Sequence, residues 1–548
     1  DQLLEDHHES LLGPLDAEAD RADGPRQVRG GQGLGRRGVG AGVGGGQFGQ
    51  QPHQVLGQCG RLLLLALHRH LGALGEHLQV EDAVARFADG AGFLEPGHTH
   101  LFVIPADGGA PRQLTTGEFD VFGPPAWSAD GKRLYLSANR DADIDFDPLE
   151  SELYALTLAD ATLERLTDRD GPDQAPRISP DGKHLAWLGF DDHGLSYANA
   201  QLSVMDLASG RTRVLTPALD ASVDNAVWVD ARSLAISYDR RGATEIARVD
   251  LAQGRLSTLA RDYGGTSMGR PYTGGALSAA GGRIAYTQGR ADRPADIAVI
   301  AGGKTRRLTD LSDALLSQRE LGRVEEIEFA SSADQRRIQG WIVYPPGFDA
   351  GKRYPLLLEI HGGPFAAYGP HFAPEIQLYA AQGYVVLYLN PRGSTSYGAE
   401  FANLIHQNYP SQDYDDLMSG VDAVIERGYI DGDNLFVTGG SGGGALTAWI
   451  VGSTERFRAA VVAKPVINWF SHTLTADSYP FFVRYWHPGP PWEQADYYFR
   501  HSPISRVGKV VTPTMVIVGD SDLRTPVSEA EQFYQALRLR RVPSAMVR

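Results

Sequence analysis

Hydrophobic and polar positions alternate in a recurring pattern between residues 98 and 318. Residues 127–136 contain two short alternating runs around Asp130-Gly131, and residues 178–187 repeat this arrangement around Asp181-Gly182. Weaker copies occupy 228–236 and 277–286, and several units end in a Leu-Thr pair. An Asp-Gly pair between alternating runs is typical of a two-residue hairpin turn. About four and a half units of about 50 residues predict β-propeller blades; a β-sandwich is less favoured, because its strands do not recur with one fixed pattern.

From residue 319 to residue 548 the pattern changes to apolar runs that alternate with helical stretches. Five continuous apolar runs are candidate buried strands, at residues 355–360, 384–389, 435–438, 459–462 and 514–518. Continuous apolar runs are typical of strands that are covered on both faces. We therefore expect a mostly parallel α/β sheet in this region.

Residues 1–97 do not resemble the rest of the chain. They contain no Lys, Ile, Thr, Asn, Tyr, Trp or Met, and residues 38–46 are a glycine-rich run. Such a composition is typical of a disordered, low-complexity tail. A second interpretation, which we favour, is frame-shifted or wrong-strand translation of GC-rich DNA, because every missing residue type needs codons that contain A or T.

Composition limits the partners and the compartment. A length of 548 residues indicates two or three domains. The net charge of −16 argues against nucleic-acid binding, which would need a basic surface. The longest early aliphatic run, residues 62–67, is too short to span a membrane. The single Cys59 fits a reducing compartment, so we expect a cytoplasmic protein. Because the chain begins at Asp1, a periplasmic or secreted protein stays open. An oligomer also stays open.

Ser441 is the candidate nucleophile. It stands in a Gly-Gly-Ser-Gly-Gly stretch, after the apolar run 435–438 and before a helical stretch. Small flanking residues allow a sharp strand-to-helix turn that lifts a serine hydroxyl above a sheet. A serine hydroxyl also needs a histidine base and a carboxylate that orients the histidine.

Two loops complete the candidate chemistry. The stretch His361-Gly362-Gly363-Pro364 follows the run 355–360, so the backbone N–H groups of Gly363 and Gly442 are the expected oxyanion-hole donors. We expect His361 to fix this loop and not to act as a base.

The second loop follows the run 514–518 and carries the candidate carboxylate. We expect Asp522 to be this carboxylate and Asp520 to shape the turn. Arg524 has two open interpretations: it holds the loop, or it contacts a substrate carboxylate or carbonyl group.

These motifs, together with Asn-Pro-Arg-Gly-Ser at 390–394, Tyr397-Gly398, and residues 501–503 and 522–526, resemble the prolyl oligopeptidase family, most closely its acylaminoacyl-peptidase-like branch. The resemblance runs from about residue 98 to residue 548. It implies a β-propeller joined to an α/β-hydrolase domain that cleaves short peptides without metal or cofactor. It also implies Ser441 as nucleophile and Asp522 as orienting carboxylate. The alternatives are an esterase on the same fold, or a propeller binding protein with a decayed hydrolase.

The chain departs from the family pattern at its histidine. In the family this residue lies on the loop after the strand that follows the aspartate loop, and residues 542–548 resemble that strand. No histidine follows His501 in the 548 residues. We therefore expect a truncated and nearly inactive chain, in which His472, His487 and His501 do not substitute for the missing base.

Substrate choice stays open at this point. Dipeptidyl peptidases of this family hold a free N-terminus with paired glutamates from the propeller. The adjacent pair Glu325-Glu326 lies at the domain junction, which disfavours that activity. Blocked N-termini, internal peptide bonds and C-terminal residues remain as alternatives.

Overall fold

A short antiparallel hairpin begins the part of the chain that the structure describes. The computed structural model describes residues 87–94, 97–141 and 143–548. Strand β1 (Phe87–Ala88) pairs with β2 (Gly92–Phe93), inside the stretch for which we predicted disorder or mistranslation. That prediction otherwise concerns residues 1–86, which lie outside the described residues.

Four antiparallel groups of four strands each form the repeat region, the last two joined in one eight-stranded sheet, and a two-stranded sheet precedes them. The two-stranded sheet consists of β3 (Phe102–Val103) and β4 (Arg112–Gln113). The four larger groups consist of β5 (Val121–Trp127), β6 (Arg133–Ala138), β7 (Glu152–Thr157) and β8 (Leu163–Arg165); β9 (Asp173–Ile178), β10 (His184–Gly189), β11 (Gln201–Asp206) and β12 (Thr212–Val214); β13 (Val223–Asp230), β14 (Ser233–Arg240), β15 (Ala243–Asp250) and β16 (Leu256–Tyr263); and β17 (Leu277–Ala280), β18 (Arg283–Arg290), β19 (Arg293–Ala301) and β20 (Lys304–Arg307).

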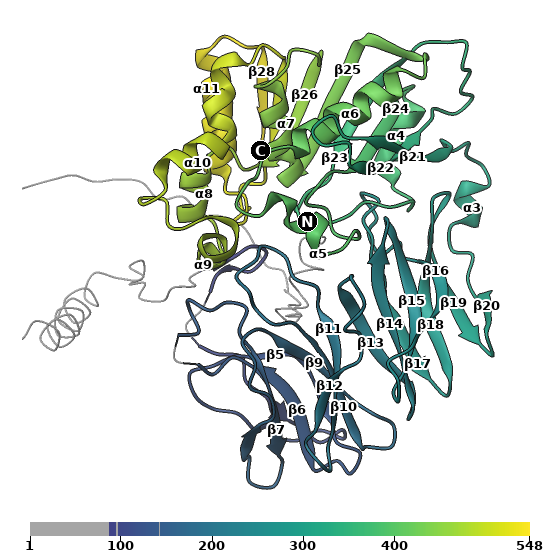
Figure 1. Ribbon diagram of the computed structural model, residues 1–548, viewed down its shortest axis with the longest axis vertical. Coiled ribbons are helices and arrows are strands. Elements are labelled where there is room, and N and C mark those ends of the chain that lie inside the picture. Colours follow the sequence, from purple (N-terminus) through teal and green to yellow (C-terminus); the bar gives the residue numbers. More distant parts are fainter. Residues whose placement is uncertain (1–86, 95–96, 142) are drawn as a thin grey trace, which may run out of the picture. The chain divides into compact units, whose positions relative to one another are not determined.

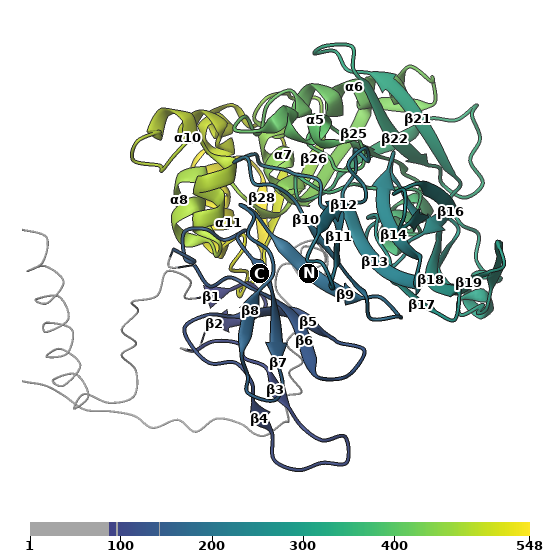
Figure 2. The ribbon, with the colours of Figure 1, turned by 60° about the horizontal axis from the view of Figure 1, so that its bottom comes forward.

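These sheets confirm the predicted blades and their number. The two-stranded sheet is half a unit, and the four larger groups follow it in chain order (Figures 1 and 2). Neighbouring groups contact each other through their first strands, β5, β9, β13 and β17. Residue Tyr263 of β16 also pairs with Gln288 of β18, which joins the last two units into one hydrogen-bonded sheet.

The Leu-Thr pair of each repeat has a structural reason. In each repeat the threonine hydroxyl oxygen accepts a hydrogen bond of 2.9 Å from a backbone N–H at the neighbouring strand. The donor and acceptor pairs are Leu101 and Thr115, Leu153 and Thr167, Leu202 and Thr216, and Ile297 and Thr309. The threonine therefore replaces a ladder hydrogen bond at the end of the sheet, where a buried N–H would otherwise be unpaired.

The Asp-Gly turns are wider than the two-residue turn we predicted. The Ser128 N–H donates to the Arg133 carbonyl oxygen at 2.9 Å, so Ala129–Lys132 form the loop. A carboxylate oxygen of Asp130 accepts hydrogen bonds from the Ser128 hydroxyl (2.7 Å) and the Lys132 N–H (3.1 Å). Gly131 has φ 67°, a left-handed conformation that glycine adopts without strain. The aspartate side chain thus closes the loop in place of a tighter backbone turn.

One eight-stranded sheet forms the second half of the chain. Its order is β21-β22-β24-β23-β25-β26-β27-β28; the contacts of β22 are antiparallel and those from β24 to β28 are parallel. The strands are β21 (Val324–Ala330), β22 (Arg337–Val343), β23 (Tyr354–Ile360), β24 (Val385–Asn390), β25 (Ile430–Ser441), β26 (Ala459–Pro465), β27 (Thr514–Ile517) and β28 (Ser544–Val547). The five predicted buried strands are β23 to β27, so the predicted mostly parallel sheet is confirmed.

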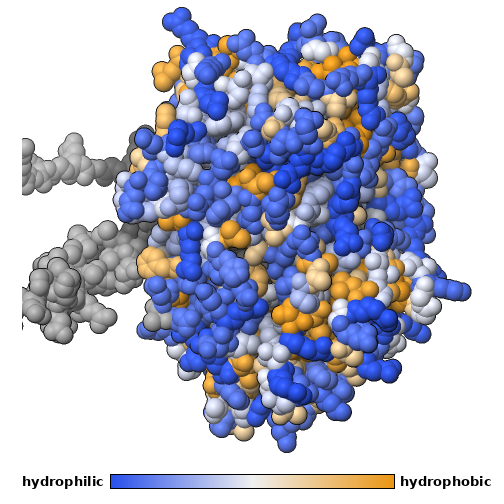
Figure 3. Space-filling view, viewed as in Figure 1, coloured by the Kyte–Doolittle hydropathy of each residue, from blue (hydrophilic) through white to orange (hydrophobic). Residues whose placement is uncertain are grey.

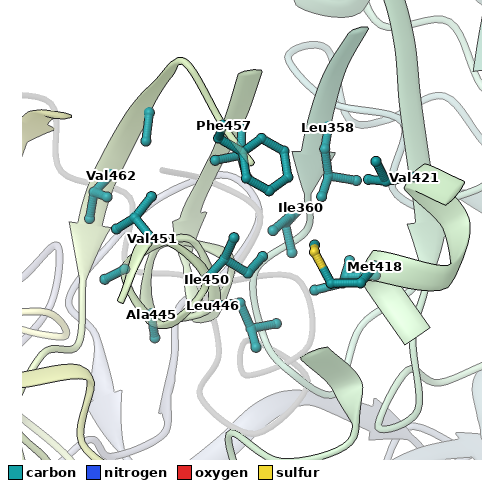
Figure 4. Close-up of a cluster of buried hydrophobic side chains, with 14 of the residues drawn as sticks. Leu358, Ile360, Met418, Val421, Ala445, Leu446, Ile450, Val451, Phe457 and Val462 are labelled. Atoms are coloured by element: carbon teal, nitrogen blue, oxygen red, sulfur yellow. The ribbon is translucent and has the colours of Figure 1, made fainter. Parts of the chain in front are cut away.

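Helices cover the sheet, and the alternation of side chains explains how. Residues Leu387 and Leu389 of β24 join a core cluster with α6 (Asp413–Ile425) and α7 (Gly442–Val451), whereas Val386 and Tyr388 join a cluster with α4 (Pro374–Ala381). Successive residues of a strand face opposite sides, so a strand covered on both sides has a continuous apolar run. Figure 4 shows Met418 of α6 and Leu446 of α7 in the cluster around Leu358 and Ile360.

The remaining α-helices mostly belong to the segments that connect the strands of this sheet along the chain. They are α3 (Asp313–Leu316), α5 (Ala399–Ala402), α8 (Trp469–Thr475), α9 (Tyr479–Phe481), α10 (Ala495–His501) and α11 (Val527–Leu539). No helix in residues 87–94, 97–141 and 143–548 has the length and apolar character needed to cross a membrane. On the face that Figure 3 shows, hydrophilic side chains surround small hydrophobic groups.

Candidate active site

Ser441 lies at the sharp junction between β25 and α7. It has φ 58° and ψ −121°, a conformation that non-glycine residues rarely adopt and that is typical of strained functional turns. Close packing explains the neighbouring glycines, since a Cβ on Gly443 would lie 2.2 Å from the Ile360 carbonyl oxygen. The Ser441 hydroxyl has no hydrogen-bond partner among the described residues. The junction therefore has the geometry expected of a nucleophile elbow.

The predicted oxyanion-hole residues come together beside this junction. A Cβ on Gly442 would lie only 2.9 Å from the Gly363 carbonyl oxygen, so the two backbones are in contact. Gly363 has φ 115°, which only glycine adopts readily. Within the described part of the chain, neither the Gly363 N–H nor the Gly442 N–H has a hydrogen-bond acceptor. Two unpaired N–H groups beside a serine hydroxyl can stabilise an oxyanion.

His361 is buried and holds the oxyanion loop. Its Nδ1 lies 2.7 Å from the Gly362 carbonyl oxygen and its Nε2 lies 2.9 Å from the Ser394 hydroxyl, both within hydrogen-bond distance. Burial lowers the pKa of His361 to about 4, so the ring is neutral near pH 7. Both ring nitrogens are occupied by the loop, which agrees with the expected structural role.

Asp522 follows β27 on the same carboxyl edge of the sheet as Ser441. Only β26 separates their strands in the sheet order. The carboxylate accepts hydrogen bonds from the Thr525 N–H (2.6 Å) and the Thr525 hydroxyl (2.9 Å). Burial raises the pKa of Asp522, while these hydrogen bonds and Lys464 lower it. Asp520, in contrast, is exposed and pairs with Arg548 at 2.7 Å.

Arg524 holds the Asp522 loop in place. Its guanidinium donates two hydrogen bonds to Asp477, one of them 3.0 Å long, and only 18% of the arginine side chain is exposed. The N–H of Leu523 donates to an Asp89 carboxylate oxygen at 2.9 Å, and the Asp89 N–H donates to Asp477 at the same distance. Of the two interpretations of Arg524, these contacts favour the loop-holding one.

The three candidate substitute histidines are engaged elsewhere or enclosed. The Nε2 atom of His472 hydrogen-bonds to the Arg524 carbonyl oxygen at 3.0 Å. The ring of His501 contacts the Tyr497 carbonyl oxygen and the Asn408 side chain. His487 is buried among aromatic rings, with both ring nitrogens unpaired. No described histidine hydrogen-bonds to Ser441 or Asp522.

An aromatic pocket, which no local sequence motif indicated, borders the oxyanion loop. It is nearly filled by its own side chains, with room of only about 10 Å³ for water-sized groups, and its lining consists of Ser196, Pro364, Phe365, Ile405, Tyr409, Trp469, Trp486, His487 and Tyr497. The Tyr409 hydroxyl donates to the Gly442 carbonyl oxygen at 2.9 Å, which connects the pocket wall to the nucleophile turn. Its lining residues come from distant segments, so only the local density of aromatic residues between 469 and 498 hinted at it.

Two aspartates of the repeat region lie close to each other and to Tyr197. Burial and the neighbouring Asp239 raise the pKa of Asp224 well above its ordinary value. Burial and these same carboxylates also raise the pKa of Tyr197, whose ring stacks on Phe365 with centroids 5.9 Å apart. The glutamate pair that the sequence analysis considered is engaged at the other end of the sheet, where Glu325 pairs with Arg427 and Glu326 accepts from Gln339.

The described residues offer no obvious metal site. Among residues 87–94, 97–141 and 143–548, no three His, Cys, Asp or Glu side chains are grouped so that they could hold a metal ion.

Comparisons with known proteins agree with this architecture. The sequence model of the prolyl oligopeptidase family matches residues 370–548, and that of the TolB β-propeller domain matches residues 98–318. An uncharacterized peptidase of Bacillus subtilis, YuxL, is 32% identical over 472 residues, which cover 82% of this chain and 70% of that protein. Dipeptidyl-peptidase 5 of Porphyromonas gingivalis is 25% identical over 476 residues, which cover 82% and 67%.

A solved structure shares the fold. The acylaminoacyl peptidase of Pyrococcus horikoshii superposes with a TM-score of 0.73 at 21% identity, covering 86% of this chain and 72% of that chain. The fold class predicted from the sequence, a propeller followed by an α/β-hydrolase domain, is therefore confirmed.

Replacing His487 by phenylalanine is expected to make stability less dependent on pH. Burial lowers the pKa of His487 to about 3, whereas an unfolded histidine titrates near 6.5. The unfolded chain therefore binds a proton that the folded chain excludes, and the free energy of unfolding falls as the pH drops below about 6.5. Urea unfolding at pH 7.5 and 5.5 should show His487→Phe gaining about 1 kcal/mol on the parent at the lower pH.

The exposed His193 provides the control, since His193→Phe should change stability equally at both pH values. An equal effect of His487→Phe at pH 7.5 and 5.5 would contradict the neutral, buried state of this ring.

Proposed function

The chain belongs to the prolyl oligopeptidase family of serine peptidases, and we propose that it hydrolyses short peptides through an acyl-enzyme formed on Ser441. One observation carries this proposal: the strained Ser441 turn holds an unpaired hydroxyl beside the unpaired N–H groups of Gly363 and Gly442. The proposal places the acyl-transfer chemistry at the carboxyl edge of the parallel sheet.

In this mechanism the Ser441 oxygen attacks the scissile carbonyl carbon, and the carbonyl oxygen becomes an oxyanion. The Gly363 and Gly442 N–H groups donate to that oxyanion, and one such donor contributes roughly 3–4 kcal/mol. A base takes the Ser441 proton during the attack and gives it to the amine as the C–N bond breaks; a water molecule then attacks the ester, and its proton returns through the same base to the Ser441 oxygen. Asp522, held by Thr525, is the carboxylate that orients a histidine, by analogy with the family.

The chemistry of the aromatic pocket supports an apolar side chain at the residue that donates the scissile carbonyl, and the lining side chains would move apart to admit it, because the pocket is nearly filled. It lies directly after the oxyanion loop, through Pro364 and Phe365. Its lining contains no acidic or basic residue other than His487, which burial keeps neutral near pH 7. A charged side chain would lose its hydration there without gaining a partner.

A free N-terminus is a second candidate feature of the substrate. The acidic pair Asp224 and Asp239 could pair with an ammonium group, and Tyr197 connects this pair to the pocket wall. Relatives named dipeptidyl-peptidase 5 favour the same possibility. In this candidate the pair Asp224 and Asp239 takes the place of the pair Glu325 and Glu326.

An esterase or a decayed, propeller-based binding protein would share the same fold. Both alternatives are separated from a peptidase by Ser441-dependent cleavage of an amide bond, because anilides and peptides resist simple esterases. A cytoplasmic location, inferred from the single Cys59, stays a prediction.

The polypeptide of residues 1–548 is expected to hydrolyse a peptide anilide slowly, and imidazole should accelerate the reaction. Loss of a triad histidine lowers the rate by about 10⁶-fold, and neutral imidazole can supply the missing base from solution. The rate should rise with imidazole concentration in the parent and in Ser453→Ala, a serine at the far end of α7.

Ser441→Ala should abolish the imidazole-dependent rate, and Asp522→Asn should reduce it at least tenfold. Fast hydrolysis without imidazole would contradict the expectation that residues 1–548 supply no base to Ser441. Imidazole-dependent hydrolysis that survives in Ser441→Ala would contradict the assignment of the nucleophile.

Substrates with leucine or phenylalanine before the scissile bond are expected to react at least tenfold faster than those with lysine or glutamate. The reason is the cost of burying a charge among Phe365, Trp469 and Trp486 without a partner. A matched series of anilides, compared by kcat/KM, measures this preference. Equal values for leucine and lysine would exclude the aromatic pocket as the binding site of that side chain.

Asp224→Asn is expected to raise KM about tenfold for dipeptide anilides with a free N-terminus and to leave N-blocked anilides within twofold. The physical reason is the loss of a charge that pairs with the ammonium group. Asp250→Asn, which alters a turn aspartate of the same region, is the control. Equal losses for free and blocked substrates would rule out this ammonium site.

A further inference from the structure

A segment of the propeller reaches the loop that forms the candidate oxyanion hole. This segment, residues 270–273, lies between β16 and β17. Tyr272 forms an isolated antiparallel β-bridge with Tyr368 of the hydrolase domain. The Gly369 N–H donates to the Pro271 carbonyl oxygen (2.8 Å), and the Thr273 N–H donates to the Ala367 carbonyl oxygen (3.1 Å). The propeller thus pairs with the backbone immediately after the oxyanion loop.

The Tyr272 hydroxyl contacts the oxyanion loop directly. It accepts a hydrogen bond of 2.7 Å from the Gly362 N–H. A Cβ on Gly362 would lie 3.2 Å from this hydroxyl and 3.3 Å from the Cβ of Ser441. Gly362 is therefore enclosed between a propeller tyrosine and the nucleophile.

A buried ion pair fixes the same segment to the sheet. The Arg270 guanidinium lies 2.7 Å from a carboxylate oxygen of Glu359, which is fully buried in β23 two residues before His361. Arg270 also pairs with Glu375 at 3.3 Å. A buried carboxylate without a counter-charge is strongly destabilising, so Glu359 requires the propeller residue Arg270. The ion pair therefore anchors the segment two residues before Tyr272.

Two contacts together determine how the Gly362–Gly363 peptide is oriented. His361 lies within hydrogen-bond distance of the Gly362 carbonyl oxygen, and Tyr272 binds the Gly362 N–H. The Gly362 N–H belongs to the His361–Gly362 peptide, so Tyr272 holds that plane, whereas His361 holds the Gly362–Gly363 plane, in which the Gly363 N–H points opposite to the carbonyl. Holding both planes restricts φ and ψ of Gly362 and thereby the direction of the Gly363 N–H. Consecutive glycines have wide conformational freedom and would not hold this orientation alone.

We propose that Tyr272 is a positioning residue of the oxyanion hole, supplied by the propeller, and that it keeps the Gly363 N–H aligned with the carbonyl attacked by Ser441. The proposal rests on the function proposed above for Ser441 and Gly363. It gives the propeller a part in transition-state stabilisation in addition to any role in substrate access.

Tyr272→Phe tests this role with little change in packing, because it retains the ring, whose centroid lies 4.7 Å from that of the Tyr368 ring. The matched control is Tyr286→Phe, which removes a propeller hydroxyl that donates to Asp262 at 2.9 Å. Hydrogen–deuterium exchange of the peptide that contains residues 361–369 should be at least tenfold faster in Tyr272→Phe and unchanged in Tyr286→Phe. This readout does not require catalysis.

The second readout is the imidazole-supported, Ser441-dependent hydrolysis of a peptide anilide. Tyr272→Phe should lower kcat about 10- to 100-fold and keep KM within twofold, because an oxyanion donor acts in the transition state. Tyr286→Phe should keep both parameters within twofold. Unchanged exchange, unchanged kcat, or a rise in KM alone would overturn the proposal. Absence of Ser441-dependent hydrolysis in the parent would instead overturn the proposed function, and exchange would still report the Tyr272 contact.

Discussion

The sharp turn at Ser441 is the constraint on which the rest of the site depends. A residue with φ 58° between a buried strand and a buried helix is strained, and the surrounding structure must compensate for that strain. Helix α7 is buried along its whole length, and its second residue, Gly443, packs against the carbonyl oxygen of Ile360 at the end of β23. The same close approach brings the loop after β23 to the serine. One packing contact thus places the Ser441 turn beside the loop that contains Gly362 and Gly363.

Buried polar groups hold the loops around this turn, and each has a specific partner. Asp477 binds Arg524 beneath the Asp522 loop, and Glu359 binds Arg270 beneath the oxyanion loop. His361 is neutral and spans two loop segments. Because an unpaired polar group in the interior costs free energy, such pairs restrict each loop to few conformations. The geometry of the candidate site is therefore maintained by buried side chains behind its loops.

The strength of the local sequence signal explains which parts were predictable. The blades and the strands β23 to β27 carry period-two alternation or continuous apolar runs, and both patterns survive into the structure because burial imposes them. The prediction of a two-residue Asp-Gly turn was wrong, since the Asp130 side chain accepts hydrogen bonds that permit a wider loop. The hairpin at Phe87–Phe93 was not expected, because its composition gives no strand signal.

The sequence by itself determined the order of domains, the parallel sheet, and Ser441, Gly363, Gly442 and Asp522 as candidates, because each depends on residues that are neighbours along the chain. Only the tertiary structure revealed the contact of Arg524 with Asp477, the aromatic pocket, the Asp224–Asp239 pair and the contact of Tyr272 with Gly362. These features join residues that are from 15 to about 300 positions apart in the sequence. Such contacts arise from packing between strands, loops and domains, and no local pattern of residues encodes them.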